Sequence, residues 1–194
     1  MLRIIDLSQN EFTGHLPAKF FHSFEAMMNA DGHKMDLNYM GGSYYQDSVT
    51  IVLKGNEIHM EKILNTFTTI DLSNNKFQGK IPNIIGKLNS LRLLNLSHNS
   101  LVGHIPISLG DLTDLESLDL SENQLVGNIP VQLTSLTFLA VLNLSHNHLV
   151  GPIPLGKQFY TFENYSYTGN LGLCGFPLTK KCTYIITCWE GDFH

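Results

Sequence analysis

Leucine and other apolar residues recur along this chain with a fixed spacing, and an asparagine marks the same place in every copy. The segment 91–106 reads LRLLNLSHNSLVGHIP, and closely similar segments occupy 115–130 and 139–154. The marker asparagines follow one another at intervals of 24 residues, at Asn75, Asn99, Asn123 and Asn147. A constant period of this size predicts a solenoid of stacked coils.

The apolar residues within each copy predict one short strand, a turn and a helical return. Leucines such as Leu94 and Leu96 alternate with one polar residue, so a strand sends both to the same side, which must be the core. The Gly-x-Ile-Pro segment that follows favours a turn, and the spacing of Leu109 and Leu112 is typical of a short helix. Two further copies start at Phe67 and near Met1, and neighbouring coils are expected to pair their strands in parallel.

The repeated asparagine is predicted to be structural. Its side chain both donates and accepts hydrogen bonds, so it can satisfy backbone groups at the point where each strand turns away. Stacked coils then carry a ladder of these side chains, an interpretation that we favour over a ligand-binding stripe. The predicted ladder consists of Asn75, Asn99, Asn123 and Asn147.

An insertion interrupts the regular winding near the start of the chain. Asn10 and Asn75 occupy equivalent places but lie 65 residues apart, 41 more than one period of 24. Within the insertion, the β-branched residues of 49–53, the pair Lys54-Gly55 and Ile58 predict a strand, a turn and a returning segment, which we expect to pack on the solenoid as a small hairpin. Apolar residues at helical spacing precede it and are expected to pack in the core: Phe20, Phe21, Phe24, Met27 and Met28.

Composition limits the possible functions further. With 194 residues, of which 43% are hydrophobic, the chain is large enough for one domain with a continuous core. A net charge of -5 with only 12 lysines and arginines argues against nucleic acid as a partner. No apolar stretch reaches the roughly 18 to 20 residues that are needed to cross a bilayer. The first residues run directly into a repeat without a secretory signal, so we expect a longer parent protein.

No pattern of reactive residues predicts an enzyme. An active site needs a nucleophile, a base and an orienting group that converge, and no such set stands apart from the repeat positions. Among nine histidines, His98, His146 and His148 fall at repeat positions without a clustered set of Cys, Asp or Glu, so neither a metal nor a cofactor is expected. The sequence therefore predicts a protein that binds other proteins or peptides.

Polar residues form two columns on the open side of the predicted strands. The column between the paired leucines and the serine column beside it consist of Asp71, Asn95, Asp119, Asn143, and of Ser73, Ser97, Ser121, Ser145. The serines turn Asn95 and Asn143 into N-glycosylation sequons as a by-product of the repeat. A third sequon, at Asn164, lies outside the repeats, and we expect it to be the better candidate for a surface glycan.

The motif Leu-x-x-Leu-x-Leu-Ser-x-Asn-x-Leu-x-Gly-x-Ile-Pro resembles the plant-specific class of leucine-rich repeats. The inserted residues Tyr44-Tyr45-Gln46-Asp47-Ser48-Val49-Thr50-Ile51 and Lys54-Gly55 resemble the island segment of plant receptor-like proteins, the cell-surface immune receptors related to the tomato Cf and Verticillium-resistance proteins. The Gly-Leu-Cys-Gly-x-Pro-Leu segment at 172–178 resembles the cap of the same class. The resemblance implies a leucine-rich repeat solenoid, an α/β-type right-handed superhelix of short parallel strands with 3-10 or short helical returns.

The predicted organisation has five parts. They are a first repeat with the start of the interruption (1–25), an island (26–66), regular repeats (67–156), a C-terminal cap (157–182) and an unstructured tail (183–194). Cys174 and Cys182 are placed to close the stack with a disulfide, which suits a secreted setting. In the alternative, Cys188 joins them as a metal or redox ligand, but no Cys-x-x-Cys motif occurs, and we expect Cys188 to be unpaired.

The resemblance also implies partners. In this family the ectodomain recognises an extracellular peptide or protein, the island and the last repeats contact the ligand and a co-receptor kinase of the SERK type, and a membrane helix anchors the parent protein at the plasma membrane. Two of the candidate contacts are histidines that are expected to titrate near the mildly acidic pH outside plant cells. The candidate ligand or co-receptor contacts are Tyr44, Tyr45, Asp47, Lys54, Asp71, Asp119, Glu122, His98 and His146.

Two other binding functions stay open at this stage. The chain also resembles the end of the ectodomain of a leucine-rich repeat receptor kinase such as the brassinosteroid receptor, which carries an island as well. A soluble secreted inhibitor or decoy of the polygalacturonase-inhibiting type has similar repeats but no island, so the 41 inserted residues count against it. Neither the ligand nor the choice between defence and development follows from these residues.

Overall fold

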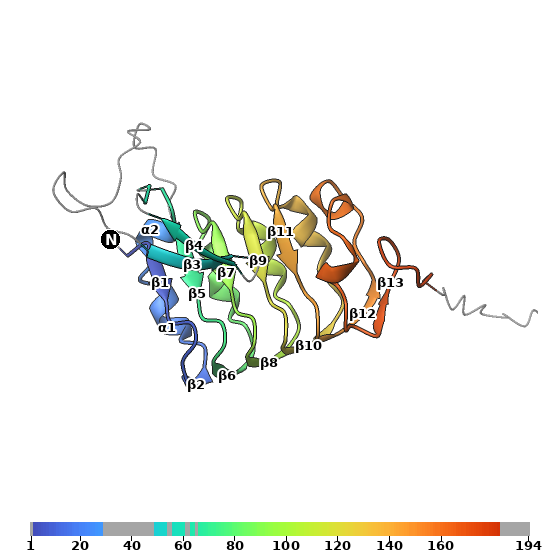
Figure 1. Ribbon diagram of the computed structural model, residues 1–194, viewed down its shortest axis with the longest axis horizontal. Helices are drawn as coiled ribbons and strands as arrows, with labels where there is room; N and C mark the ends of the chain where they lie inside the picture. Colours follow the sequence, from blue (N-terminus) through green and yellow to red (C-terminus); the bar gives the residue numbers. More distant parts are fainter. Residues whose placement is uncertain (1, 29–48, 54–55, 61–62, 65, 183–194) are drawn as a thin grey trace, which may run out of the picture.

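The computed structural model describes residues 2–28, 49–53, 56–60, 63–64 and 66–182 of the chain. The described residues form a stack of coils in which two parallel sheets run along the length of the solenoid (Figure 1). Short 3-10 helices return the chain from one coil to the next. This architecture confirms the predicted leucine-rich repeat solenoid.

The first sheet takes one strand from each of five coils, in the order β1-β5-β7-β9-β11. Its strands are parallel and in register, so that Ile70, Leu94 and Leu118 are direct partners across neighbouring strands. This sheet contains the Leu-x-Leu strands that the repeat predicts. They are β1 (Ile4–Asp6), β5 (Thr69–Asp71), β7 (Leu93–Asn95), β9 (Ser117–Asp119) and β11 (Val141–Asn143).

A second parallel sheet, in the order β13-β12-β10-β8-β6-β2, was not predicted. Its strands follow the repeated asparagine, and β6, β8 and β10 each bury only one residue, so the hydrophobic alternation is too short to mark a strand. These strands form because the neighbouring coil offers a partner backbone. They are β2 (Thr13–His15), β6 (Lys76–Gly79), β8 (Ser100–Gly103), β10 (Gln124–Gly127), β12 (His148–Pro152) and β13 (Gly172–Cys174).

The predicted helical returns are 3-10 helices that begin directly after the Ile-Pro pair of each repeat. They are η1 (Asn83–Lys87), η2 (Ile107–Asp111) and η3 (Val131–Ser135), and the cap adds η4 (Gln158–Tyr160) and η5 (Asn164–Ser166). Gly110 in η2 lies against the next coil, where a Cβ atom would approach the Gln132 carbonyl oxygen to 2.6 Å. Only glycine permits so close a contact between backbones.

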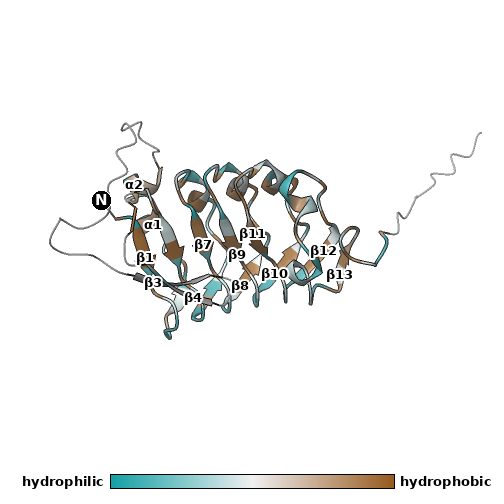
Figure 2. Ribbon diagram, turned by 45° about the horizontal axis from the view of Figure 1, so that its top comes forward, coloured by the Kyte–Doolittle hydropathy of each residue, from teal (hydrophilic) through white to brown (hydrophobic). Residues whose placement is uncertain are grey.

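One hydrophobic core runs through all coils, between the first sheet and the 3-10 helices. The regular coils each contribute two apolar strand residues together with an isoleucine or leucine from the return, such as Ile85, Leu109 or Leu133. In the first coil, Leu7 is exposed instead. The strands of the first sheet, such as β7, β9 and β11, are coloured as largely hydrophobic, whereas much of the turn regions is hydrophilic (Figure 2). A coil buries its leucines only against its neighbours. The stabilising free energy of burial, about 1.5 to 3 kcal/mol per leucine, is therefore gained only when coils stack.

The repeated asparagines form the predicted ladder between coils. Asn123 is buried, and its Nδ2 donates to the carbonyl oxygens of Leu96, Leu120 and Ser121 at 3.0, 3.3 and 3.1 Å. Its Oδ1 accepts the backbone N–H of Leu101 at 2.9 Å. Each asparagine therefore satisfies backbone groups of its own coil and of the preceding one. Asn75, Asn99 and Asn147 make equivalent bonds.

The inserted residues leave the stack between its first two coils. β1 and β5 are adjacent in the first sheet, with Ile5 opposite Ile70, although the whole insertion separates them in the sequence. The described part of the insertion includes an antiparallel hairpin of β3 (Val49–Leu53) and β4 (Asn56–Met60). In Figure 1 this hairpin crosses in front of the first sheet.

Two one-turn helices, α1 (Ala18–Phe21) and α2 (Glu25–Met28), complete the first coil. Phe21 and Met27 are in the core, and the Met27 carbonyl oxygen accepts the Ser90 N–H at 2.9 Å from the second coil. These contacts agree with the expectation that the apolar cluster packs inward. Phe20 is the exception, because its side chain is exposed.

The cap is a sixth, modified coil. Asn170 adds a rung to the ladder, since its Nδ2 donates to the carbonyl oxygens of Leu144 and Tyr167, both at 2.9 Å, and its Oδ1 accepts the Leu149 N–H at 3.0 Å. Tyr167 replaces the second strand leucine and is buried. Cys174 and Cys182 form a disulfide with their Cα atoms 5.0 Å apart. The cap thus covers the core edge of the fifth coil.

The ladder yields a stability prediction for Asn123→Leu. The substitution leaves the Leu101 N–H and the Leu96 carbonyl without this partner, which is expected to lower the free energy of unfolding by about 2 to 5 kcal/mol. Urea unfolding followed by circular dichroism measures the loss. The matched control is Gln124→Leu at the exposed neighbouring position, where a change below about 0.5 kcal/mol is expected. Equal losses in the two variants would show that the asparagine ladder is not the cause.

The cap disulfide yields a second prediction. Replacing both Cys174 and Cys182 by alanine frees a short loop in the unfolded chain, and the chain-entropy argument gives a loss of about 2 to 3 kcal/mol in the free energy of unfolding. The measurement is the shift of the urea midpoint between the wild type and the double variant, both at neutral pH. An unchanged midpoint contradicts a stabilising role for the disulfide.

Candidate functional site

A groove of ≈ 840 Å³ lies along the open face of the first sheet. Its described lining comes from the strands, from the turns that follow them and from the cap, so no single repeat forms it. The lining residues are Gln9, Ser73, Asn74, Leu93, Asn95, Ser97, His98, Ser117, Asp119, Ser121, Ala140, Val141, Leu142, Asn143, Phe162 and Tyr165.

The polar floor of the groove is held in place by hydrogen bonds within and between coils. Asp119 Oδ1 accepts the N–H and the hydroxyl of Ser121 at 2.9 and 2.6 Å, and Asn143 makes the same pair of bonds with Ser145 at 3.2 and 2.7 Å. Across coils, Asn143 Nδ2 donates to Asp119 Oδ2 at 3.2 Å. The side chains of this column are thus oriented before any ligand arrives.

The two aspartates of the column differ in their access to solvent. Asp71 is only 4% exposed, and its Oδ2 accepts a hydrogen bond from Asn95 Nδ2 at 3.1 Å. Burial raises the pKa of the Asp71 carboxyl above its ordinary value, although hydrogen bonds from Ser73 and Asn95 offset part of the shift. Asp119 is half-buried and lines the groove. A basic group on a ligand therefore reaches Asp119 more readily than Asp71.

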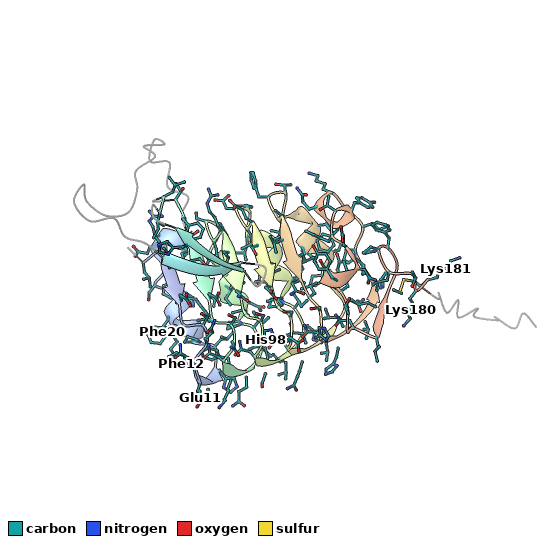
Figure 3. The ribbon with its side chains drawn as sticks, viewed as in Figure 1. Glu11, Phe12, Phe20, His98, Lys180 and Lys181 are labelled. Carbon is teal, nitrogen blue, oxygen red and sulfur yellow. A yellow bond between two sulfur atoms is a disulfide. The ribbon has the colours of Figure 1, made fainter. Side chains whose placement is uncertain are left out.

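The candidate contacts His98, Glu122 and His146 occupy one repeated position at the turn after each strand. Each has a positive φ, of 51°, 52° and 53°, a left-handed conformation that is uncommon for these residue types. His98 is exposed and lines the groove, and Figure 3 shows it at the end of its strand. Glu122 and His146 lie 3.7 Å apart, and this ion pair exists only when the imidazole is protonated. Of the three, only His98 belongs to the lining.

One end of the groove is apolar, and the sequence patterns did not identify its residues. Val141 and Ala140 come from the fifth coil, whereas Phe162 and Tyr165 come from the cap. Phe162 is buried and Tyr165 is 61% exposed. The spacing of Asn170 after Asn147 was a usable signal that the cap continues the winding. No signal in the sequence placed the two aromatic residues beside Val141.

The four island residues that were singled out, Tyr44, Tyr45, Asp47 and Lys54, lie outside the described residues, as does the tail 183–194 with Cys188. The three sequon asparagines are described and differ in environment. Asn95 is buried, Asn143 is half-buried in the groove, and Asn164 is exposed in the cap.

Within the described ranges, no group of three or more His, Cys, Asp or Glu side chains is arranged to hold a metal ion. The same part of the chain contains no helix with the length and hydropathy that a membrane span requires.

Comparison with known proteins identifies the family. The family model "Leucine Rich Repeat" matches residues 1–23, 66–88, 90–112, 114–136 and 138–157. Receptor-like protein 52 of Arabidopsis thaliana is 49% identical over 90 residues, which cover 45% of this chain and 11% of that protein. The chain therefore matches only about a tenth of the length of such a relative.

Two solved structures share the fold. The BIR2 ectodomain from Arabidopsis thaliana aligns with a TM-score of 0.54 and 40% sequence identity, over 58% of this chain and 59% of that chain. The structure of the Arabidopsis receptor kinase HAESA in complex with the peptide hormone IDA and the co-receptor SERK1 contains a chain that aligns with a TM-score of 0.55 and 27% identity, over 89% of this chain and 26% of the other.

These matches confirm the resemblance that the repeat motif indicated, and they assign the chain to binding modules rather than to enzymes. The chain belongs to the leucine-rich repeat family, and its repeats are of the kind found in the ectodomains of plant receptor-like proteins.

Proposed function

We propose that this chain is part of the ectodomain of a plant receptor-like protein and holds an extracellular peptide, or a segment of a protein, in the groove of the first sheet. The observation that carries the proposal is the groove itself. It is long, open and preorganised, with a hydrogen-bonding floor and one apolar end. An extended peptide fits such a surface, because its backbone bonds to the polar floor while its side chains occupy the ends.

The chemistry of the groove selects for a basic group on the ligand. Among the described lining residues, Asp119 is the one carboxylate. The Ser121 N–H, the Ser121 hydroxyl and Asn143 Nδ2 occupy three of its roughly four acceptor positions. A lysine or arginine of the ligand supplies a further donor with the complementary charge. The apolar end formed by Val141, Phe162 and Tyr165 favours an aliphatic or aromatic residue beside it.

The second part of the proposal is a co-receptor kinase of the SERK type that docks on the peptide-loaded ectodomain at the extracellular face of the plasma membrane. Its support is the similarity to HAESA, whose structure contains both a peptide hormone and SERK1. The cap disulfide suits an oxidising extracellular environment. The resulting signal serves defence or development.

A peptide selection tests the groove. The immobilised chain is used to select from a displayed library of random 12-residue peptides, and the enriched peptides are expected to carry a basic residue. Val141→Arg introduces a charge at the apolar end and Asp119→Asn removes the carboxylate, so each is expected to weaken binding of an enriched peptide at least about tenfold, or by 1.4 kcal/mol. Biolayer interferometry measures the dissociation constants.

The matched control is Val126→Arg on the second sheet, where the valine is also partly exposed but does not line the groove. This variant is expected to bind the selected peptides as the wild type does. Thermal unfolding verifies that all three variants are folded. Peptides that bind all three variants equally well would show that the groove is not the binding site.

A separate experiment tests the co-receptor. The purified SERK1 ectodomain is titrated into the chain with and without a selected peptide. Because peptide and co-receptor are proposed to bind cooperatively, the peptide is expected to tighten SERK1 binding by about 5- to 150-fold. The apparent affinity of the peptide must then rise by the same factor, which a reciprocal titration measures. Identical SERK1 binding in both titrations contradicts the coupling.

A further inference from the structure

The three sequons have different environments, and we propose that Asn164 is the N-glycosylation site of the described chain, whereas Asn95 and Asn143 stay unmodified. All three satisfy the Asn-x-Ser rule, so the motif alone does not separate them. Because the glycosylating enzyme acts on the unfolded chain, the separation comes from which modified chains can still reach the observed fold. A glycan on a packed asparagine prevents folding, so the folded, secreted protein carries none there.

Asn95 has no room for a glycan. Its side chain belongs to a residue that is only 8% exposed, and its Nδ2 donates to Asp71 Oδ2 at 3.1 Å. Its Oδ1 accepts both the N–H and the hydroxyl of Ser97, at 3.1 and 2.8 Å. A sugar on Nδ2 replaces one of its two hydrogens and places a bulky group beside the Asp71 carboxylate of the neighbouring coil. A glycan here is therefore incompatible with the observed packing.

Asn143 is held in the same way. Its Nδ2 donates to Asp119 Oδ2, and its Oδ1 accepts both bonds from Ser145. It also lines the groove, which a branched sugar would fill. A glycan at this position would crowd the contact that orients Asp119 and would occupy the space beside it.

Asn164 has the opposite environment. It is exposed at the start of η5, and only its backbone carbonyl takes part in the described hydrogen bonds, with the Tyr167 N–H at 3.0 Å and the Thr168 hydroxyl at 3.2 Å. Its side-chain amide is not needed by any described neighbour. A sugar on Nδ2 can therefore extend into solvent without disturbing the cap.

Ser166, the third residue of this sequon, supplies an independent observation. It is 1% exposed, and its hydroxyl has no hydrogen-bond partner among the described residues. A buried hydroxyl without a partner is unfavourable in a folded protein, so packing alone favours alanine here. In the described part of the chain, Thr69, Ser90 and Tyr167 also bury hydroxyls without a partner, but only Ser166 belongs to a sequon. Its hydroxyl has a role before folding, when the glycosylating enzyme reads Asn-x-Ser on the unfolded chain.

The chemistry requires a lipid diphosphate-linked oligosaccharide as the donor. The Asn164 amide nitrogen forms a bond to C1 of the first sugar, the bond from C1 to the diphosphate oxygen breaks, and the lipid diphosphate leaves. The amide nitrogen gives up one proton to a base of the transferase. Donor and enzyme belong to the secretory route, and the Cys174–Cys182 disulfide fits the oxidising conditions of that route.

The proposed glycan has a consequence for access to the groove. The next residue, Tyr165, lines the apolar end of the groove, so the sugar begins one residue from that end. A large hydrophilic group there keeps a bound chain from extending over the cap. Ligands are then directed toward the part of the groove nearer the first coils.

The test uses the full 194-residue chain, secreted from a eukaryotic host that glycosylates proteins. Enzymatic deglycosylation of the monomeric protein in ¹⁸O water marks each formerly occupied asparagine, and peptide mass spectrometry reads the marks. The expected result is a mark on most copies of Asn164 and none on Asn95 or Asn143. An unmarked Asn164, or a marked Asn95 or Asn143, overturns the proposal.

Variants verify the assignment and separate it from folding defects. Asn164→Gln and Ser166→Ala are each expected to remove one glycan from the mass of the intact protein, whereas the matched changes Ser97→Ala and Ser145→Ala remove none. Ser166→Ala is also expected to leave the thermal midpoint of deglycosylated protein unchanged or higher, because the hydroxyl makes no hydrogen bond. A lower midpoint would assign the serine a structural role and remove that support. For any variant that is not secreted, the gel shift of the cell-retained chain gives the glycan count.

Discussion

The structure depends on the mutual satisfaction of backbone groups between neighbouring coils. A coil of 24 residues is too small to bury its leucines or to pair its strands alone. Each ladder asparagine bonds to carbonyl groups of its own coil and to backbone groups of the preceding coil, as Asn123 does with Leu96 and Leu101. The asparagine thus fixes the distance and register of two coils at once. Core packing, both sheets and the groove all follow from that register.

This constraint also explains how the fold tolerates a long insertion. Strand pairing and the asparagine hydrogen bonds connect each coil to the next. β1 and β5 therefore pair directly, although the insertion lies between them in the sequence. The first coil keeps its place because Phe21 and Met27 pack into the shared core. An insertion placed between coils therefore adds a hairpin in front of the first sheet without changing the stack.

The candidate site is a property of the stack rather than of any repeat. Asp119 and Asn143 belong to successive coils, and the hydrogen bond between them orients the carboxylate toward the groove. The same geometry that prepares this column for a ligand makes its asparagines poor glycan acceptors. In the cap, Ser166 takes the column position that Asn143 has in the fifth coil, since its carbonyl oxygen accepts the Leu144 N–H as the Asn143 carbonyl accepts the Leu120 N–H. Asn164 lies at the start of η5, outside this column. The proposed ligand contacts thus lie on the regular strands, and the proposed glycan lies on η5 of the cap.

The sequence by itself determined the period, the buried leucines, the 3-10 returns and the coil-to-coil asparagines, because each of these is a local pattern that recurs at Asn75, Asn99, Asn123 and Asn147. Tertiary structure decided the rest. The second sheet forms only where a neighbouring backbone is available, and burial distinguishes Asp71 from Asp119 although their sequence contexts match. Tyr165 joins Val141 at the groove because the cap winds once more, with Asn170 as its last rung. These features depend on distances between coils, which a one-dimensional pattern does not contain.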